Sequence, residues 1–200
     1  MNNKSLIIGV IVVIVLIIGG MTLFSNSSKN TPSQTGTDTT MVPVTTTNPQ
    51  GVLVGGAYMT ADRDIVSNAL NASNVTTLVA AVKAAGLVST LQGPGPFTVF
   101  APTNDAFNKL PAGTVETLLK PENKATLVDI LTYHVVAGRY TLSDLSDGQV
   151  LKTVEGKPLK IGKVNNQITV NGTAMVETAD VISSNGVTFV IDTVLMPSKN

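Results

Sequence analysis

The sequence contains no cysteine, a single histidine and few charged residues. Without cysteine, the chain has no disulfide, no thiolate metal site and no thiol nucleophile. Because His134 is the only imidazole, a zinc site would need its other ligands from carboxylates or water. Thirteen basic residues balance thirteen acidic ones, and only 13% of residues are charged. The chain therefore lacks the basic surface typical of nucleic-acid binding, and we expect neither a nucleic-acid partner nor a cofactor.

Sequence motifs for catalysis are also missing. The chain has no G-x-S-x-G nucleophile elbow, no G-x-x-x-x-G-K-[ST] phosphate loop and no D-x-[DN]-x-[DN]-G calcium loop. A Ser–His–Asp arrangement could use only His134. We therefore expect a protein that is not an enzyme and holds no metal. The alternative is a hydrolase or small-ligand carrier with a cleft near Tyr133.

An uncharged apolar run extends from Leu6 to Phe24. As a helix it would measure roughly 28 Å, close to the hydrocarbon core of a bilayer. A signal peptide usually has a shorter apolar region that ends in a small-residue cleavage site, and no such site follows Phe24. We expect residues 1–24 to form a single-pass membrane anchor with the rest of the chain outside the cell membrane. A cleaved signal peptide and a secreted protein are the alternative.

Residues 25–56 are rich in serine, threonine, asparagine, proline and glycine. They contain too few large apolar side chains to offset the entropy lost on folding. We expect a flexible linker, in which Val52–Val54 pairs loosely with the following domain.

Residues 57–200 have the hydrophobic pattern of a globular domain. Apolar residues recur at helical spacing in its first half, whereas β-branched runs separated by turn sequences fill its second half. Helices followed by strands indicate an α+β fold. The expected helices are 62–70, 76–87 and 121–134, and the expected strands are 97–100, 158–162, 167–172, 174–182 and 187–195.

The stretch FTVFAPTNDAF, residues 97–107, predicts a strand that turns directly into a helix. Pro102 ends the strand, and the threonine that follows it is a typical helix N-cap. We interpret this corner as scaffold and not as an active site. Its expected core residues are Phe97, Val99 and Phe107, and its expected capping residues are Thr103, Asn104 and Asp105.

Three segments resemble the signature segments of the fasciclin domain. They are GPFTVFAPTNDAFNKLP (95–111), YHVVAGRYTLSDL (133–145) and SSNGVTFVIDTVLMP (183–197). The resemblance implies a β-wedge or sandwich with helices packed on one side, and it adds Asp192 to the scaffold residues. It also implies a surface module of cell adhesion, matrix or envelope proteins. The expected partner is a cell-surface or matrix protein or a polysaccharide, besides the membrane bound by the N-terminal helix.

The same resemblance suggests two sites of partner recognition. Tyr133 and His134 match a tyrosine–histidine segment linked to adhesion, although both rings could instead lie under the helices and bond to the backbone. Asp180 and Val181 match an aspartate–isoleucine pair used in partner recognition, although an aspartate at a strand end is also ordinary turn chemistry.

One position departs from the family. Phe189 stands where the last segment usually has a histidine, so a titratable imidazole is replaced by an apolar ring. Any pH response or hydrogen bond centred on that position is therefore not expected in this chain.

Asparagine sequons give possible glycosylation sites. Three lie in the expected domain, at Asn71, Asn74 and Asn171, and a fourth lies in the linker at Asn26.

Overall fold

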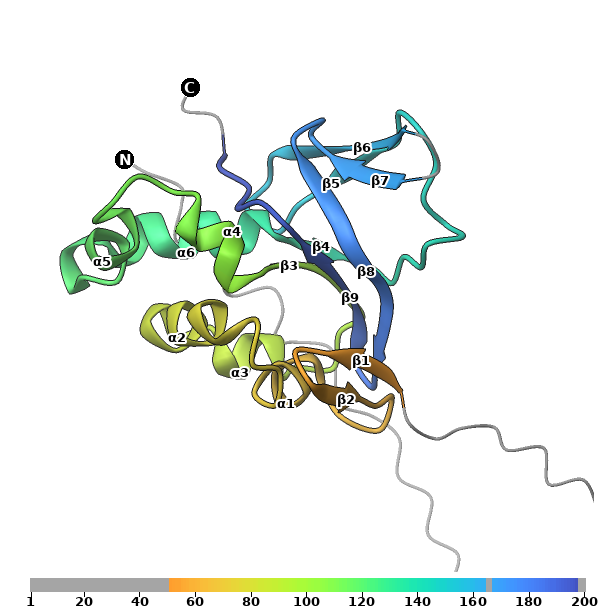
Figure 1. Ribbon diagram of the computed structural model, residues 1–200, viewed down its shortest axis with the longest axis horizontal. Coiled ribbons are helices and arrows are strands. Elements are labelled where there is room, and N and C mark those ends of the chain that lie inside the picture. The colour runs from red at the N-terminus through yellow and green to blue at the C-terminus, as the bar shows by residue number, and fades with distance from the viewer. Residues whose placement is uncertain (1–50, 165–166, 198–200) are drawn as a thin grey trace, which may run out of the picture. The chain divides into compact units, whose positions relative to one another are not determined.

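The computed structural model describes residues 51–164 and 167–197 (Figure 1). The expected anchor and most of the expected linker lie outside these residues. No helix within the described ranges is long and apolar enough to cross a membrane.

The helical elements are α1 (Ile65–Ala69), α2 (Thr76–Ala85), α3 (Val88–Leu91), α4 (Asn104–Asn108), α5 (Thr114–Leu118), the 3₁₀ turn η2 (Pro121–Asn123) and α6 (Lys124–Tyr133). The strands are β1 (Val52–Val54), β2 (Ala57–Met59), β3 (Phe97–Pro102), β4 (Val135–Ala137), β5 (Val150–Lys152), β6 (Pro158–Val164), β7 (Gln167–Val170), β8 (Ala174–Ser183) and β9 (Gly186–Ile191).

The two longest helices form where the sequence places an apolar stripe. Helix α2 buries Leu78, Ala81, Val82 and Ala85, which recur every three or four residues along one face. It ends at Gly86, whose φ of 75° is the left-handed conformation that glycine adopts most easily, as the sequence predicts. Helix α6 buries a similar stripe of four residues, Leu127, Ile130, Leu131 and Tyr133.

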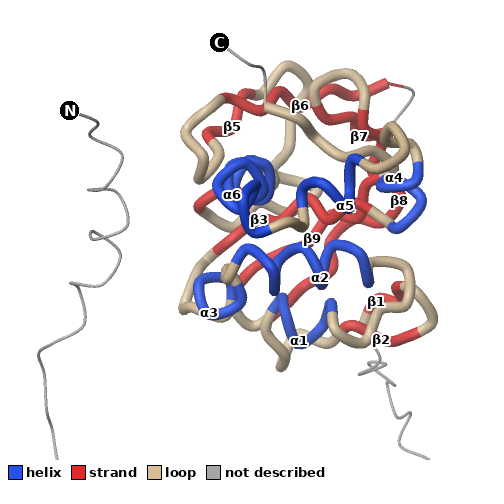
Figure 2. The backbone as a smooth tube through the Cα atoms, turned by 90° about the vertical axis from the view of Figure 1, so that its left-hand side faces the viewer, coloured by secondary structure: helices blue, strands red, loops and turns tan. Residues whose placement is uncertain are grey.

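Seven strands form one sheet in the order β4-β3-β9-β8-β7-β6-β5. Strands β3 and β9 run parallel, and the other neighbouring strands are antiparallel. The two outer strands meet each other: Val136 bridges to Thr153, and the Val154 N–H donates to the Val135 carbonyl at 2.7 Å. The sheet therefore curls into a barrel-like wedge. The helices gather on one side of it (Figures 1 and 2), as the α+β expectation required.

Strands β3 and β9 form a shared wall between two apolar cores. Val99, Ala101 and Val190 face the core made with the helices. Phe100 and Phe189 face the core inside the curled sheet, where their ring centroids lie 5.5 Å apart and the rings stack. The residue at the position of the family's histidine is thus a fully buried core ring.

The structure corrects one expected core residue. Phe97 is only half-buried, because it starts β3 at the edge of the shared wall, whereas Phe100 is completely buried. Val99 and Phe107 are buried as expected.

The ends of several elements differ from the sequence expectation. Strand β9 stops at Ile191, four residues before the expected end at Leu195. At the other end of the domain, Val52–Val54 pairs with Ala57–Met59 in an antiparallel hairpin, so the first strand precedes the expected boundary at residue 57. Helices α3 and α5 and strands β4 and β5 were not expected. Each has three to five residues, too few to show a hydrophobic period.

The shared wall leads to a stability prediction. We expect Phe189→Ala to lower the free energy of unfolding by about 3–5 kcal/mol, because it leaves a cavity against Phe100. Phe97→Ala serves as the comparison, and its loss should be clearly smaller because part of that ring already faces water. Urea unfolding of both variants measures the difference. Equal losses would contradict the assignment of Phe189, and not Phe97, to the core.

Candidate functional site

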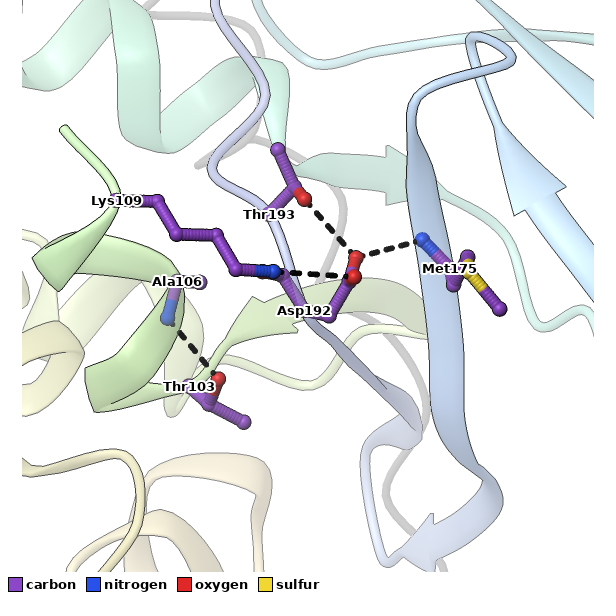
Figure 3. Close-up of polar contacts among 6 residues, drawn as sticks. All are labelled: Thr103, Ala106, Lys109, Met175, Asp192 and Thr193. Atoms are coloured by element: carbon purple, nitrogen blue, oxygen red, sulfur yellow. Dashed lines mark hydrogen bonds and ion pairs between the residues drawn. The ribbon is translucent and has the colours of Figure 1, made fainter.

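The corner between β3 and α4 is a capped turn. The Thr103 hydroxyl oxygen accepts a hydrogen bond from the Ala106 N–H at 3.2 Å (Figure 3), and Thr103 has extended backbone angles. This confirms Thr103 as the N-cap of α4. Asp105 lies exposed in the first turn of the same helix, where a negative charge interacts favourably with the helix dipole.

Asn104 caps a different helix from the one it begins. Its side-chain oxygen accepts from the Thr77 N–H at 3.0 Å and from the Thr76 hydroxyl at 3.2 Å, and its amide donates to the Ser73 carbonyl at 3.0 Å. The N-cap of α2 is Val75, which has no side-chain acceptor of its own. Asn104 therefore supplies the missing cap and ties α4 to the start of α2.

Asp192 joins three elements through one carboxylate (Figure 3). One oxygen accepts from the Met175 N–H at 2.8 Å and from the Thr193 hydroxyl at 2.9 Å. The other pairs with the Lys109 ammonium at 3.2 Å, and the same ammonium donates to the Asp192 carbonyl at 2.7 Å. Partial burial raises the pKa of Asp192, but these hydrogen bonds and the lysine charge together lower it below the ordinary value. Asp192 thus fixes the end of β9 to the start of β8 and, through Lys109, to the C-terminal end of α4.

Tyr133 lies in the core of the curled sheet. Its hydroxyl donates to the Pro158 carbonyl at 3.1 Å and accepts from the Asn171 amide at 2.9 Å. The ring is 5% exposed, so its polar tip is paired inside the domain.

His134 is also buried, and both ring nitrogens have backbone partners. Nδ1 lies 2.8 Å from the Ile130 carbonyl, and Nε2 lies 2.9 Å from the Leu195 nitrogen. A carbonyl requires a donor and an N–H requires an acceptor, so the pattern assigns the proton to Nδ1 and the lone pair to Nε2. Burial lowers the pKa of His134 to about 4, although the bond to Ile130 raises it, and the ring is neutral near pH 7.

The burial of these two rings favours the scaffold interpretation of the tyrosine–histidine segment. Neither ring is presented to solvent, so any influence of Tyr133 or His134 on a partner would act through the backbone that they position.

Asp180 lies in a bulge of β8, and Val181 beside it is a core residue. The register of β8 against β9 shifts between Thr178 and Val181, and Asp180 has a φ of 53°, a conformation that aspartate tolerates better than most residues. Val181 is 3% exposed and packs with the helices. The bulge therefore turns the Asp180 carboxylate outward while Val181 stays inside.

The Asp180 carboxylate holds a short loop that displays Leu142. One carboxylate oxygen accepts from the Leu142 N–H at 2.7 Å. The same loop is closed by Asp144, which accepts from both the N–H and the hydroxyl of Thr141, at 2.8 and 2.7 Å. Leu142 is 38% exposed between these two carboxylates. We call Leu142, Asp144 and Asp180 the bulge patch; it is an exposed apolar residue in a hydrogen-bonded loop with an acidic rim.

The three sequons of the domain have different environments. Asn71 is exposed, and its amide bonds only to the Ser67 carbonyl at 2.8 Å. Asn171 uses its amide on Tyr133 and its side-chain oxygen on the Lys160 N–H. The side-chain oxygen of Asn74 is buried without a partner among the described residues. Asn71 is therefore the sequon that could carry a glycan without breaking an internal contact of the core, and Asn26 lies outside the described residues.

Three buried polar residues that the sequence analysis did not single out hold the helices and loops to the sheet. The Asn185 amide group accepts from the Ile65 N–H and donates to the Leu91 and Gly93 carbonyls. Asn68 and Thr98 make similar paired bonds. The N-G dipeptide at Asn185 signals a turn in the sequence, but nothing in the sequence shows where its side chain reaches.

Two hollows in the described surface are open and are lined by few polar side chains. One, of about 320 Å³, lies along α1 and α2 and is lined mostly by alanine, leucine and valine. Within the described ranges, no group of three metal-binding side chains comes together. The bulge patch is therefore the candidate for partner recognition.

The Asp192 contacts lead to a matched pair of stability predictions. We expect Asp192→Ala to cost about 2 kcal/mol or more, because it removes a charged acceptor from the Met175 N–H. Lys109→Met removes an exposed ion-pair partner and the exposed hydrogen bond of Lys109 to the Asp192 carbonyl, and it should cost less, about 1 kcal/mol. Thermal or urea unfolding of the two variants checks the order, and a larger loss for Lys109→Met would contradict it.

The Tyr133 hydroxyl gives another prediction. Tyr133→Phe leaves the Asn171 amide without its acceptor and should lower the free energy of unfolding by about 1–3 kcal/mol. Tyr140→Phe is the control, because the Tyr140 hydroxyl makes no hydrogen bond with the described residues. Similar stabilities for the two variants in urea would show that the Tyr133 bonds contribute nothing.

Comparison with known proteins agrees with this geometry. The family model of the fasciclin domain matches residues 73–197. Protein sll1483 of Synechocystis sp. is 50% identical over 151 residues, covering 76% of this chain and 83% of that protein. Periostin of Homo sapiens is 36% identical over 126 residues, which cover 63% of this chain and 15% of periostin.

A solved structure has the same fold. The FAS1 domain pair from the insect cell adhesion molecule fasciclin I superposes with a TM-score of 0.62 at 18% identity, covering 70% of this chain and 53% of that structure. The present chain thus spans about half the length of the domain pair. The matched family model and the 50% identical relative lead to one conclusion: this chain belongs to the fasciclin-domain family.

Proposed function

We propose that the chain is a surface-exposed, non-enzymatic binding module that acts in cell adhesion or in contacts with the extracellular matrix or cell envelope. The observation that carries this proposal is the fasciclin fold itself, which the chain shares with a protein described as an insect cell adhesion molecule. The partner is a cell-surface or matrix protein or a polysaccharide.

The N-terminal part of the sequence fits this function. Leu6–Phe24 anchors the chain in the cell membrane as a single span, and the following Ser- and Thr-rich residues hold the domain away from the bilayer. Many copies on one membrane would bind multivalently, which compensates for weak contacts by a single domain. Release by cleavage near Ser25 would instead give a secreted matrix or envelope protein.

Within the domain, the bulge patch is the contact surface. Its loop is fixed by the Asp180 and Asp144 hydrogen bonds, so binding loses little conformational entropy there. An exposed leucine rimmed by carboxylates suits a partner surface that combines an apolar pocket with basic groups.

The proposal is tested by attachment of host cells and envelope polysaccharides to surfaces coated with the full chain. We expect saturable attachment to wild type, reduced at least about fivefold by Leu142→Ser and by Asp180→Asn. Asparagine keeps the acceptor for the Leu142 N–H and tolerates positive φ, so Asp180→Asn removes the charge alone.

The control variant is Asp129→Asn, which removes an exposed carboxylate from α6. It should attach like wild type. Failure of every probe to attach at any coating density would overturn the binding function. Attachment unchanged in both patch variants would place the contact elsewhere on the domain.

A further inference from the structure

The last described segment, residues 193–197, packs against the domain without forming a strand or helix. Val194 and Leu195 are nevertheless buried, one in each of the two cores. Two titratable side chains hold this segment: Asp192 at its start and His134 at its middle.

The His134 contact depends on a neutral ring. Nε2 accepts the Leu195 N–H at 2.9 Å while Nδ1 is occupied by the Ile130 carbonyl at 2.8 Å. A protonated ring carries hydrogen on both nitrogens, so Nε2–H would face Leu195 N–H, donor against donor. Rotating the ring by 180° does not relieve this repulsion, because Nδ1 also carries a hydrogen and would then face the Leu195 N–H.

No charge near the ring compensates for protonation. The shift of its pKa has two causes only, burial and the Ile130 carbonyl. The charged residues on the elements bonded to it are Lys124 and Asp129, both exposed on α6, and Asp192 at the start of the segment. Strand β3, which bonds to the His134 carbonyl through Phe100, has no charged residue.

The Asp192 contacts also require the charged form of the side chain. The carboxylate accepts hydrogen bonds from Met175, Thr193 and Lys109. Protonation removes the charge that pairs with Lys109 and weakens the remaining bonds. Acid therefore weakens both attachments of the segment in the same direction.

We propose that His134 and Asp192 form an acid-labile clasp, through which acid releases residues 193–197 from the domain before the rest of it unfolds. Release uncovers Val194 and Leu195 and opens the edge of both cores. The domain would thereby gain an apolar surface in acidic surroundings that it lacks at neutral pH.

The sign of the pH effect follows from the two protonation states of His134. Released, the ring has its ordinary pKa of 6.5, and clasped it has a pKa of about 4. Well above pH 6.5 neither state binds the proton and the clasp is at full strength. Between pH 6.5 and 4 the released state binds it more than the clasped state, so each unit of falling pH favours release by up to about tenfold. Asp192, whose pKa is lowered, adds to the effect as pH falls further.

Hydrogen–deuterium exchange of the full chain at several pH values, corrected for the intrinsic exchange rate, tests the clasp. From pH 6.5 to 4.5 we expect the opening of the Leu195 amide to increase by about fortyfold, since the released ring is already half protonated at pH 6.5. Peptides from β3 and β9 should stay protected over the same range. The proposal would be overturned if residues 193–197 were released at the same pH at which β3 and β9 lose protection. The segment would then open only by global unfolding.

His134→Gln is the matched variant. Its side-chain oxygen can accept from Leu195 and its amide can donate to Ile130, but it does not titrate. We expect its Leu195 opening to be nearly independent of pH from 6.5 to 4.5, and an unchanged increase of about fortyfold would overturn the role of His134. Should this variant not fold, ¹⁵N NMR of the wild-type ring and of the Leu195 amide gives a second test. If the ring nitrogens and the Leu195 amide change their chemical shifts with the same midpoint pH, the clasp is supported. Different midpoint pH values for the two would contradict it.

Discussion

The parallel pairing of β3 with β9 is the constraint on which the rest of the domain depends. Both strands are covered on both faces, so their side chains must alternate between the helical core and the core inside the sheet. This explains the almost continuous apolar character of β9 and the buried Thr98, whose hydroxyl both donates and accepts a backbone hydrogen bond. A polar residue is tolerated in this wall only when all its hydrogen bonds are made.

The helices depend on that wall in turn. Four of them have only four or five residues, too short to be stable alone. Side chains from distant parts of the chain hold three of these, α1, α3 and α4. Asn104 caps α2 from α4, and Asn185 holds the start of α1 and the end of α3. These long-range hydrogen bonds hold the short helices and the loops between them to the sheet.

The sequence correctly predicted those features that depend only on residues close together in the chain. The apolar stripes of α2 and α6, the glycine that ends α2 and the Thr103 cap each depend on neighbouring residues, and each was found. The buried contacts of Asn104 and Asn185 join residues far apart in the chain, and no local pattern encodes them. The same holds for the site. Asp180 was expected at the end of a strand, but it lies in a bulge inside β8, and its hydrogen bond to the Leu142 N–H depends on that bulge, which only tertiary pairing creates.

The meeting of β4 and β5 has a consequence for crowded surfaces. Open sheet edges present unpaired N–H and carbonyl groups, which can template aggregation with a neighbouring copy. In the described chain the Val136–Thr153 bridge and the Val154–Val135 bond bring the two outer strands of the seven-stranded sheet together. At these two strands, neighbouring copies would therefore meet through side chains, and the contact of β4 with β5 protects both edges against pairing with another copy.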